Sequence, residues 1–218
     1  MPESRRALAV LGLVLAFLWL PILVLVVMSF NASGTPYTWT GFSLDWYASL
    51  AGNAEILAGL GNTLVVAAGA TGLSIVLGTP LAIGLHRHVR SSALEALSIG
   101  PAIAPDLVLA IGLLSLFALS GVTIGLHSVL LGHTVFGTAF VAAVVRTRLG
   151  GIDPALEEAS RDLGATPVST FFRITIPTLA PAIIAGGLLV FTLSLDEFVI
   201  AFFTNGPATP TLPIVIYS

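Results

Sequence analysis

The chain has 218 residues, of which 56% are hydrophobic and 9% are charged, and its mean hydropathy is +1.02. A soluble domain carries about a quarter charged residues, so this composition excludes an ordinary soluble protein and indicates a lipid bilayer. Cysteine is absent, which excludes disulfides, thiolate catalysis and cysteine-based metal sites. The net charge of −3 identifies no partner, and nothing in the sequence suggests nucleic acid.

The first apolar run covers residues 7–30 and follows Arg5 and Arg6. At about 24 residues it is long enough to cross a hydrocarbon core of about 30 Å. It exceeds the apolar core of a cleavable signal peptide, and no clear small-x-small cleavage site follows, so we interpret it as a retained membrane span. Residues 31–57 are mixed and contain aromatic side chains that favour the membrane interface, which indicates an outer-surface segment with a short helix near 44–50.

Four more apolar runs follow, and each is long enough to cross a bilayer. They cover residues 60–85, 94–119, 122–145 and 179–203. Pro101 and Pro105 break the second of these four early, because proline removes a backbone hydrogen bond and bends a helix. A Gly/Pro loop at 205–213 leads into a short apolar end, which we interpret as the approach to a further span that is missing from this chain.

The polar segment at 146–178 lies between the last two runs. Asp153-Pro154 predicts a helix start, and Gly164 predicts the end of a short amphipathic helix of about three turns. Thr166-Pro167 repeats the start signal, and residues 174–177 are expected to close the second helix. The sequence therefore predicts two short helices joined by a glycine, set between two membrane spans.

All basic residues are arginines, and the five predicted spans place every one of them on the same side of the membrane. The positive-inside rule then makes that side cytoplasmic, together with the N-terminus and the segment at 146–178. The arginines are at positions 5, 6, 87, 90, 146, 148, 161 and 173.

Asp106, Asp196 and Glu197 lie well inside the apolar runs, and a charge costs about 2.5–3.5 kcal/mol at mid-membrane. Asp106 follows the two prolines, near the inner end of the third span, and either caps a helix near the cytoplasmic interface or lines a solute pathway. Asp196 and Glu197 lie in the outer part of the fifth span, roughly 26 Å along it at about 1.5 Å per residue. They serve either in structural pairing or in contact with a solute.

His133 is a further candidate for the pathway, or forms a buried hydrogen-bonded pair with Thr134. His127 is six residues away, which does not match the i, i+4 spacing of a two-histidine metal site, so no metal site is predicted. The sequence contains no nucleophile–base constellation and no phosphate-binding Gly-Lys-Ser/Thr loop. We therefore expect neither catalysis nor a cofactor in this chain.

The polar segment resembles the EAA loop of ABC importer permeases. The resemblance lies in Glu158-Ala159-Ser160, in Gly164 six residues after that glutamate, and in Ile174-x-Ile176-Pro177. Ser160 and Ile176 depart mildly from the family's Ala and Leu. The resemblance implies that Glu157 and these residues form a cytoplasmic coupling helix that docks in a groove of a separate ATP-hydrolysing subunit.

A softer resemblance to spermidine/putrescine permeases extends over most of the chain. It rests on Ser194–Ile200 followed by Thr204-Asn205-Gly206-Pro207, and also on the dipeptides Asn62-Thr63, Pro105-Asp106, His133-Thr134 and Leu212-Pro213. Family members of this type also move thiamine, ferric iron or amino-acid-like compounds, so these solutes stay open beside a polyamine. A polyamine carries two or more positive charges, which suits the acids Asp196 and Glu197.

These resemblances imply an all-α membrane protein with the type I ABC importer permease fold, with about five spans present and a sixth missing. The expected function is ATP-driven import, not catalysis, in a bacterial inner membrane. The expected partners are a dimer of ATP-binding subunits that carries the ATP and Mg²⁺, a second permease subunit and an extracytoplasmic solute-binding protein. An ion-coupled secondary transporter is the alternative, but it would require inverted repeats and paired broken helices.

Overall fold

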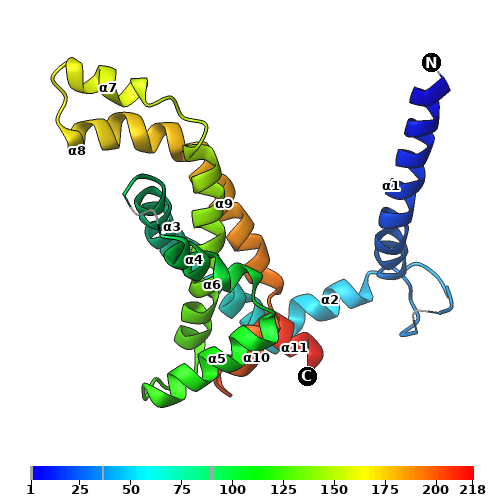
Figure 1. The fold of residues 1–218 in the computed structure, drawn as a ribbon. Coiled ribbons are helices and arrows are strands. Elements are labelled where there is room, and N and C mark those ends of the chain that lie inside the picture. Colours follow the sequence, from blue (N-terminus) through cyan, green and yellow to red (C-terminus); the bar gives the residue numbers. More distant parts are fainter. Residues whose placement is uncertain (1, 36, 89–90) are drawn as a thin grey trace. The chain divides into compact units, whose positions relative to one another are not determined.

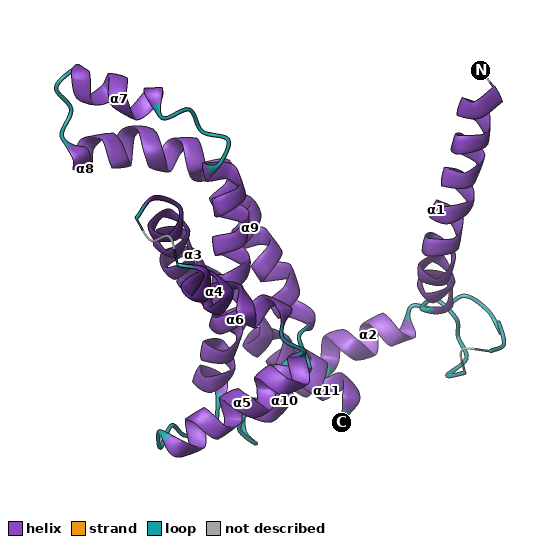
Figure 2. Ribbon diagram, in the orientation of Figure 1, coloured by secondary structure: helices purple, strands orange, loops and turns teal. Residues whose placement is uncertain are grey.

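The computed structural model describes residues 2–35, 37–88 and 91–218. Most of these residues lie in helices, as Figures 1 and 2 show. The helices are α1 (Pro2–Met28), α2 (Asp45–Gly52), α3 (Ala54–Arg87), α4 (Ser92–Ile103), α5 (Asp106–Leu119), α6 (Leu126–Leu149), α7 (Ala155–Asp162), α8 (Pro167–Thr170), the π-helix η1 (Phe171–Thr175), α9 (Ile176–Asp196), α10 (Val199–Thr204) and α11 (Leu212–Tyr217).

The apolar helices confirm the multi-span interpretation. In the described part of the chain, 4 helical stretches are long and apolar enough to cross a membrane, and the bent pair α4–α5 makes up to 5. The prediction of a single broken span at 94–119 is thus sharpened, because α4 and α5 meet at an angle of 107°. Ala104 and Pro105 adopt extended backbone angles at the break, which ends one helix and allows the next to set off in a new direction.

The chain divides into an N-terminal unit that ends at Leu57 and a main unit, Ala58–Ser218. In the N-terminal unit, every described side chain of α1 from Arg6 to Val27 is exposed, so this helix needs a bilayer or a partner around it. The loop after α1 is built around Asn31, whose side-chain amide donates to two backbone carbonyls. The predicted short helix near 44–50 is confirmed as α2.

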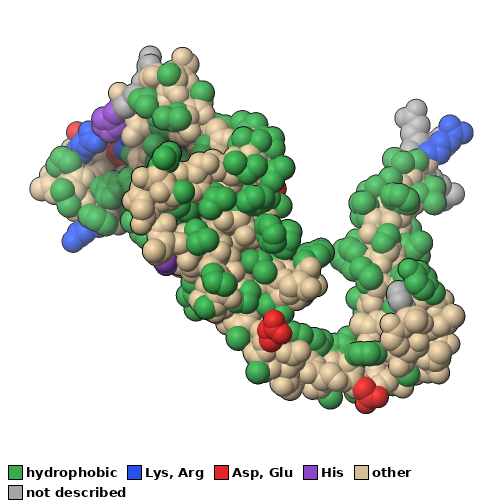
Figure 3. All heavy atoms as spheres, turned by 90° about the horizontal axis from the view of Figure 1, so that it is seen from below, with side chains coloured by type: hydrophobic (Ala, Val, Ile, Leu, Met, Phe, Trp, Pro, Cys, Tyr) green, Lys and Arg blue, Asp and Glu red, His purple; other side chains and the backbone are tan. Residues whose placement is uncertain are grey.

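The core of the main unit lies where α3, α6 and α9 meet. Its buried side chains are Ala82, Ile83, Val141, Ala142, Val145, Leu149, Leu179 and Val190. A second cluster packs α5 and α10 against α6, around Phe117, Phe136 and Ile200. Hydrophobic side chains, green in Figure 3, are spread over the visible surface between tan areas, whereas arginine and histidine side chains gather mainly at one end of this unit.

Small residues allow these helices to approach closely, as is usual where lipid removes the hydrophobic drive for association. A Cβ on Gly78 of α3 would lie 2.8 Å from the carbonyl oxygen of Thr138 in α6. A Cβ on Gly187 of α9 would lie 2.7 Å from Ile75 Cδ1 of α3. These glycines therefore allow α3 to pack closely against both α6 and α9.

Several predicted boundaries differ from the structure. The second span begins at Ala54 rather than at 60, because Asn53 Oδ1 accepts hydrogen bonds from the first free N–H groups of α3. The fourth span begins at Leu126 rather than at 122. At this helix start, Ser128 Oγ accepts a hydrogen bond from the N–H of Gly125. The fifth predicted span is not one helix, since it breaks between Asp196 and Val199 into α9 and α10.

The expectation that residues 174–177 close the second short helix is wrong. The helix continues from α8 through the π-helix η1 into α9, so that residues 167–196 form one long helical stretch. The wider π turn shifts the hydrogen-bond register just before Pro177, which therefore sits at the first positions of α9. Proline lacks an N–H group, and it follows directly after the π turn, in which the N–H of Ile176 bonds to the carbonyl of Phe171.

Candidate functional site

The first candidate site is the helical hairpin of residues 155–175, formed by α7 on one arm and α8 with η1 on the other (Figure 1). Asp153 Oδ1 accepts from the N–H of Ala155, which confirms the predicted helix start. Gly164 turns the chain with a φ of +86°, a conformation that costs other residues about 1–2 kcal/mol. Thr166 Oγ1 caps the second arm by accepting from the N–H of Ser169, as predicted.

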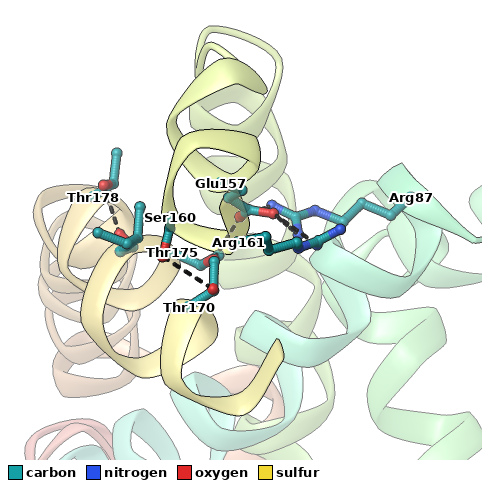
Figure 4. Close-up of polar contacts among 8 residues, drawn as sticks. Arg87, Glu157, Ser160, Arg161, Thr170, Thr175 and Thr178 are labelled. Carbon is teal, nitrogen blue, oxygen red and sulfur yellow. Dashed lines mark hydrogen bonds and ion pairs between the residues drawn. The ribbon is translucent and has the colours of Figure 1, made fainter. Parts of the chain in front are cut away.

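Glu157 lies at the centre of the polar contacts that hold α7 in place (Figure 4). The guanidinium of Arg87, at the end of α3, donates to both carboxylate oxygens, with distances of 2.7 and 2.9 Å. The hydroxyl of Thr175 in η1 donates to Oε1 at 2.5 Å, and Arg161 lies 3.8 Å away within α7. One carboxylate therefore joins α3, α7 and η1.

The charge of Glu157 is stabilised by this arrangement. The hydrogen bonds from Arg87 lower the pKa of Glu157 below its ordinary value of 4.5, partial burial opposes that shift, and the Thr175 hydroxyl and the charge of Arg161 add to the lowering. The side chain is 13% exposed, and that of Arg87 is 30% exposed. Because water is partly excluded, the pair is screened less than an ion pair on an open surface.

The remaining residues of the motif divide between the inside and the outside of the hairpin. Ser160 Oγ lies 3.1 Å from Thr170 Oγ1, so the serine that departs from the family's alanine contributes a second polar contact between the two arms. Glu158 and Ala159 are exposed. Leu156 is also exposed, at 51%, and Leu163 at 90%. The two exposed leucines give this short polar helix an apolar surface of the kind that can mark a protein contact.

The second candidate site is the membrane cavity, a space of about 350 Å³ in the main unit. It lies where the break between α4 and α5 meets the break between α9 and α10. Its lining residues are Pro101, Ala102, Asp106, Phe136, Phe140, Leu193, Asp196, Glu197, Phe198, Val199 and Ile200. Broken helices at membrane depth are tolerated where they are buried in protein or line a cavity, and both breaks lie beside this one.

The three acids of the membrane cavity are not equivalent. Glu197 accepts from the backbone N–H groups of Ile200 and Ala201 at 2.9 and 3.0 Å, and it lies 3.3 Å from His133 Nε2. His133 Nδ1 is 2.6 Å from Ser194 Oγ. By contrast, the carboxylates of Asp106 and Asp196 are exposed and form no hydrogen bond or ion pair with other residues that the structure describes. These two are available to a cation.

Two expectations about the acids need correction. Asp106 was expected near the inner end of one span and Asp196 in the outer part of another, but both line the same cavity, so they do not lie at opposite depths. Counting residues along a straight span does not give the depth of Asp106, because α4 and α5 meet at an angle of 107°. Asp106 is the first residue of α5, so its charge still favours the start of that helix, and both interpretations of Asp106 stay predictions.

His133 and Thr134 do not bond to each other. Thr134 Oγ1 donates to the carbonyl of Leu130, within its own helix, whereas His133 bonds to Ser194. The histidine is 1% exposed and lies behind Glu197 rather than among the lining residues. Its part in a solute pathway stays a prediction. Its contacts to Glu197 and Ser194 are those of a residue that holds the Glu197 side chain in position.

Comparison with known proteins assigns the chain to a family. The model of the family described as binding-protein-dependent transport system inner membrane component matches residues 74–217, which include both candidate sites. The chain belongs to this family. It is therefore a multi-pass inner-membrane subunit of a binding-protein-dependent transport system, which sets the ion-coupled alternative aside.

Named relatives and solved structures agree with this assignment. The putrescine transport system permease protein PotI of Escherichia coli (strain K12) is 40% identical, over 99% of this chain and 80% of the relative. The spermidine/putrescine transport system permease protein PotC of Haemophilus influenzae is 35% identical, over 96% of this chain and 82% of the relative. The type I ABC importer permease fold is confirmed by a bacterial alginate ABC transporter, with a TM-score of 0.73 at 17% identity over 99% of this chain and 78% of that one.

Some residues of these permease sites were not predicted from the sequence. Arg87 and Thr175 hold Glu157, but Arg87 is 70 residues away in the chain, and no local pattern links the two. Phe136 and Phe140 add aromatic faces to the membrane cavity, in an edge-to-face pair with centroids 6.3 Å apart. Their spacing of four residues on one helix face would have marked them as a pair, but not as cavity residues.

Proposed function

We propose that this permease carries polyamines, with putrescine and spermidine as the first candidates. The observation that supports this most directly is the pair Asp106 and Asp196, two carboxylates without protein partners in the described structure, in one cavity with Phe136 and Phe140. Two separate acids suit the two ends of a diammonium ion, and aromatic faces attract ammonium groups. The names of the relatives point to the same solutes.

The hairpin is the part that we assign to energy coupling. A separate ATPase subunit, which carries the ATP and Mg²⁺, is expected to receive the outer face of α7, and its closure would move the hairpin. Glu158, Leu156 and Leu163 offer that subunit an acid flanked by apolar side chains. The helix-in-groove mode of binding uses this type of exposed face. Gly164 sets the angle between the arms, and Ile174, Ile176 and Pro177 pass displacement into α9.

The orientation follows from the arginines. Arg87, Arg146, Arg148, Arg161 and Arg173 all lie at the ends of α3 and α6 or in the hairpin, so we assign this end of the main unit to the cytoplasm, and the N-terminus with it. Arg90 lies outside the described residues. The loops at 31–57 and 203–213 then face outward, toward a solute-binding protein, and a second permease subunit completes the transporter.

The test of the solute is uptake into proteoliposomes that contain the assembled transporter with its ATPase and binding-protein partners. We expect ATP-dependent uptake of labelled putrescine that excess spermidine inhibits and that butylamine, with one ammonium group, does not. Uptake inhibited by thiamine or ferric ion but not by diamines would overturn the polyamine assignment. Labelling of cysteines introduced at 154–164 by an impermeant reagent added to intact cells would overturn the orientation.

A further inference from the structure

The two neighbouring acids of α7 have different surroundings. Glu158 is exposed, whereas Glu157 is held from two sides by Arg87 and Thr175. The chain already connects α7 to α6 through residues 150–154 and to α9 through α8 and η1. It does not connect α7 directly to α3, and the Arg87–Glu157 pair supplies that third connection.

The geometry of this pair suits a mechanical connection. Arg87 Nη1 donates to Glu157 Oε2 and Nη2 donates to Oε1, and such a two-point contact fixes direction as well as distance. Arg87 is the last residue of α3, where a positive charge is also favoured by the helix dipole. Thr175 bonds to the same carboxylate, so Glu157 cannot turn away from η1 without losing that contact.

The α3 helix is well placed to pass on a displacement. Gly78 lets its backbone approach α6, and Ile75 lies against Gly187 of α9. We propose that Glu157 is a positioning residue that ties the coupling helix to α3, so that movement of α7 displaces α3 together with α9. This inference rests on the proposed function, since it assumes that an ATPase subunit moves α7.

A second ion pair at the same end of the molecule provides a matched control. Arg146 of α6 pairs with Glu95 of α4, and the exposed fractions of their side chains, 34% and 40%, also mark a partly solvated pair. This pair contacts α4 and α6 but not α7. Its loss removes a more exposed ion pair and leaves the connection between α7 and α3 intact.

The experiment measures solute transported per ATP hydrolysed by the assembled transporter in proteoliposomes, for Arg87→Gln, Glu157→Gln, the exchanged pair R87E/E157R and Arg146→Gln. We expect the ratio to fall roughly fivefold or more in the first two, in the range of typical coupling energies between sites. The exchanged pair should recover most of the loss, and Arg146→Gln should resemble the wild type. An unchanged ratio in Glu157→Gln, or an equal fall in Arg146→Gln, would overturn the proposal.

The absence of cysteine allows a test that does not depend on the charges. In the variant R87C/E157C, a short bifunctional thiol reagent should restore the ratio, whereas single-cysteine variants treated in the same way should stay uncoupled. A linked variant that remains uncoupled would contradict a mechanical role.

Retention of the ATPase subunit is measured for every variant. If the wild type fails to retain it, the proposed function fails and not this inference alone. If only Glu157→Gln releases it, Glu157 acts in docking, and the proposal is overturned.

Discussion

Glu157 in the hairpin and Asp196 in the membrane cavity are both acids, and their surroundings give them opposite uses. Glu157 is bonded by an arginine and a threonine, and it is 13% exposed. Asp196 is exposed to a cavity, and its carboxylate has no bonded partner in the described residues. A paired acid can hold two elements together. An unpaired acid beside apolar side chains is instead stabilised most by a bound cation. We therefore propose that one carboxylate transmits force in the hairpin and that the other contacts solute in the membrane cavity.

The largest effect is expected at the hairpin turn. Gly164→Asp places a side chain at a φ of +86°, so the arms should change their angle and transport should fall by at least about tenfold, with the protein still in the membrane. Gly164→Asn is the matched control for the added charge, since asparagine has almost the same size as aspartate and adopts this conformation about as readily. Uptake assays with membrane quantification test this. Equal loss in both variants would show that any side chain at this turn is harmful whatever its charge, and unchanged uptake in both would contradict the role of the turn.

The next effect separates the acids of the membrane cavity. Asp196→Asn should raise the KM for putrescine about tenfold with little change in melting temperature, because it removes one charge that contacts solute. Glu197→Gln should instead lower the melting temperature, because the amide cannot reproduce both acceptor contacts to α10 and the one to His133. If the two variants change the same quantity, the proposed division between solute contact and support is wrong.

A smaller effect concerns the pH dependence of the hairpin. The pKa of Glu157 is lowered on folding, so its contribution to stability is present above its ordinary value of 4.5 and is lost as the pH falls through the folded-state pKa. The difference in melting temperature between the wild type and Glu157→Gln should therefore be constant between pH 6 and pH 8, and it should close in the acid range. A difference that already closes near pH 6 would point to a histidine instead.

The smallest effect is expected at Ser160. Ser160→Ala restores the family's alanine and removes the contact to Thr170, which is worth about 1 kcal/mol or less at a partly solvated site. We expect slightly faster hydrogen exchange in the hairpin and unchanged uptake. The double variant with Thr170→Val should add little to the single one, and full additivity would mean that the two hydroxyls do not interact.

The hairpin could be predicted from the sequence because its signals are local. Asp153, Gly164 and Thr166 each act on backbone groups within a few residues, and all three positions are confirmed. The partner of Glu157 could not be predicted, since it lies on a helix 70 residues away. The π-helix was missed for a similar reason: a proline signals a helix start, but not whether a wider turn precedes it.

The membrane cavity was predicted only as separate residues. Pro101 and Pro105 indicated one break, but Asp196 and Glu197 were assigned to an uninterrupted helix. The second break arises because Glu197 bonds to the N–H groups of α10 rather than continuing α9. The packing of α5 and α10 around Phe136 brings the two breaks together, and such packing between distant segments leaves no mark in either segment alone.

The π-helix η1 has a geometric consequence for the far end of α9. A π turn accommodates one more residue than an α turn, and each residue of an α-helix advances the chain by about 100° of rotation. Any tightening of η1 into regular α-helix would therefore rotate α9 about its own axis. Asp196, the last residue of α9, would rotate with it. A local rewinding beside the Thr175–Glu157 contact would thus reorient a carboxylate twenty-one residues further along the chain.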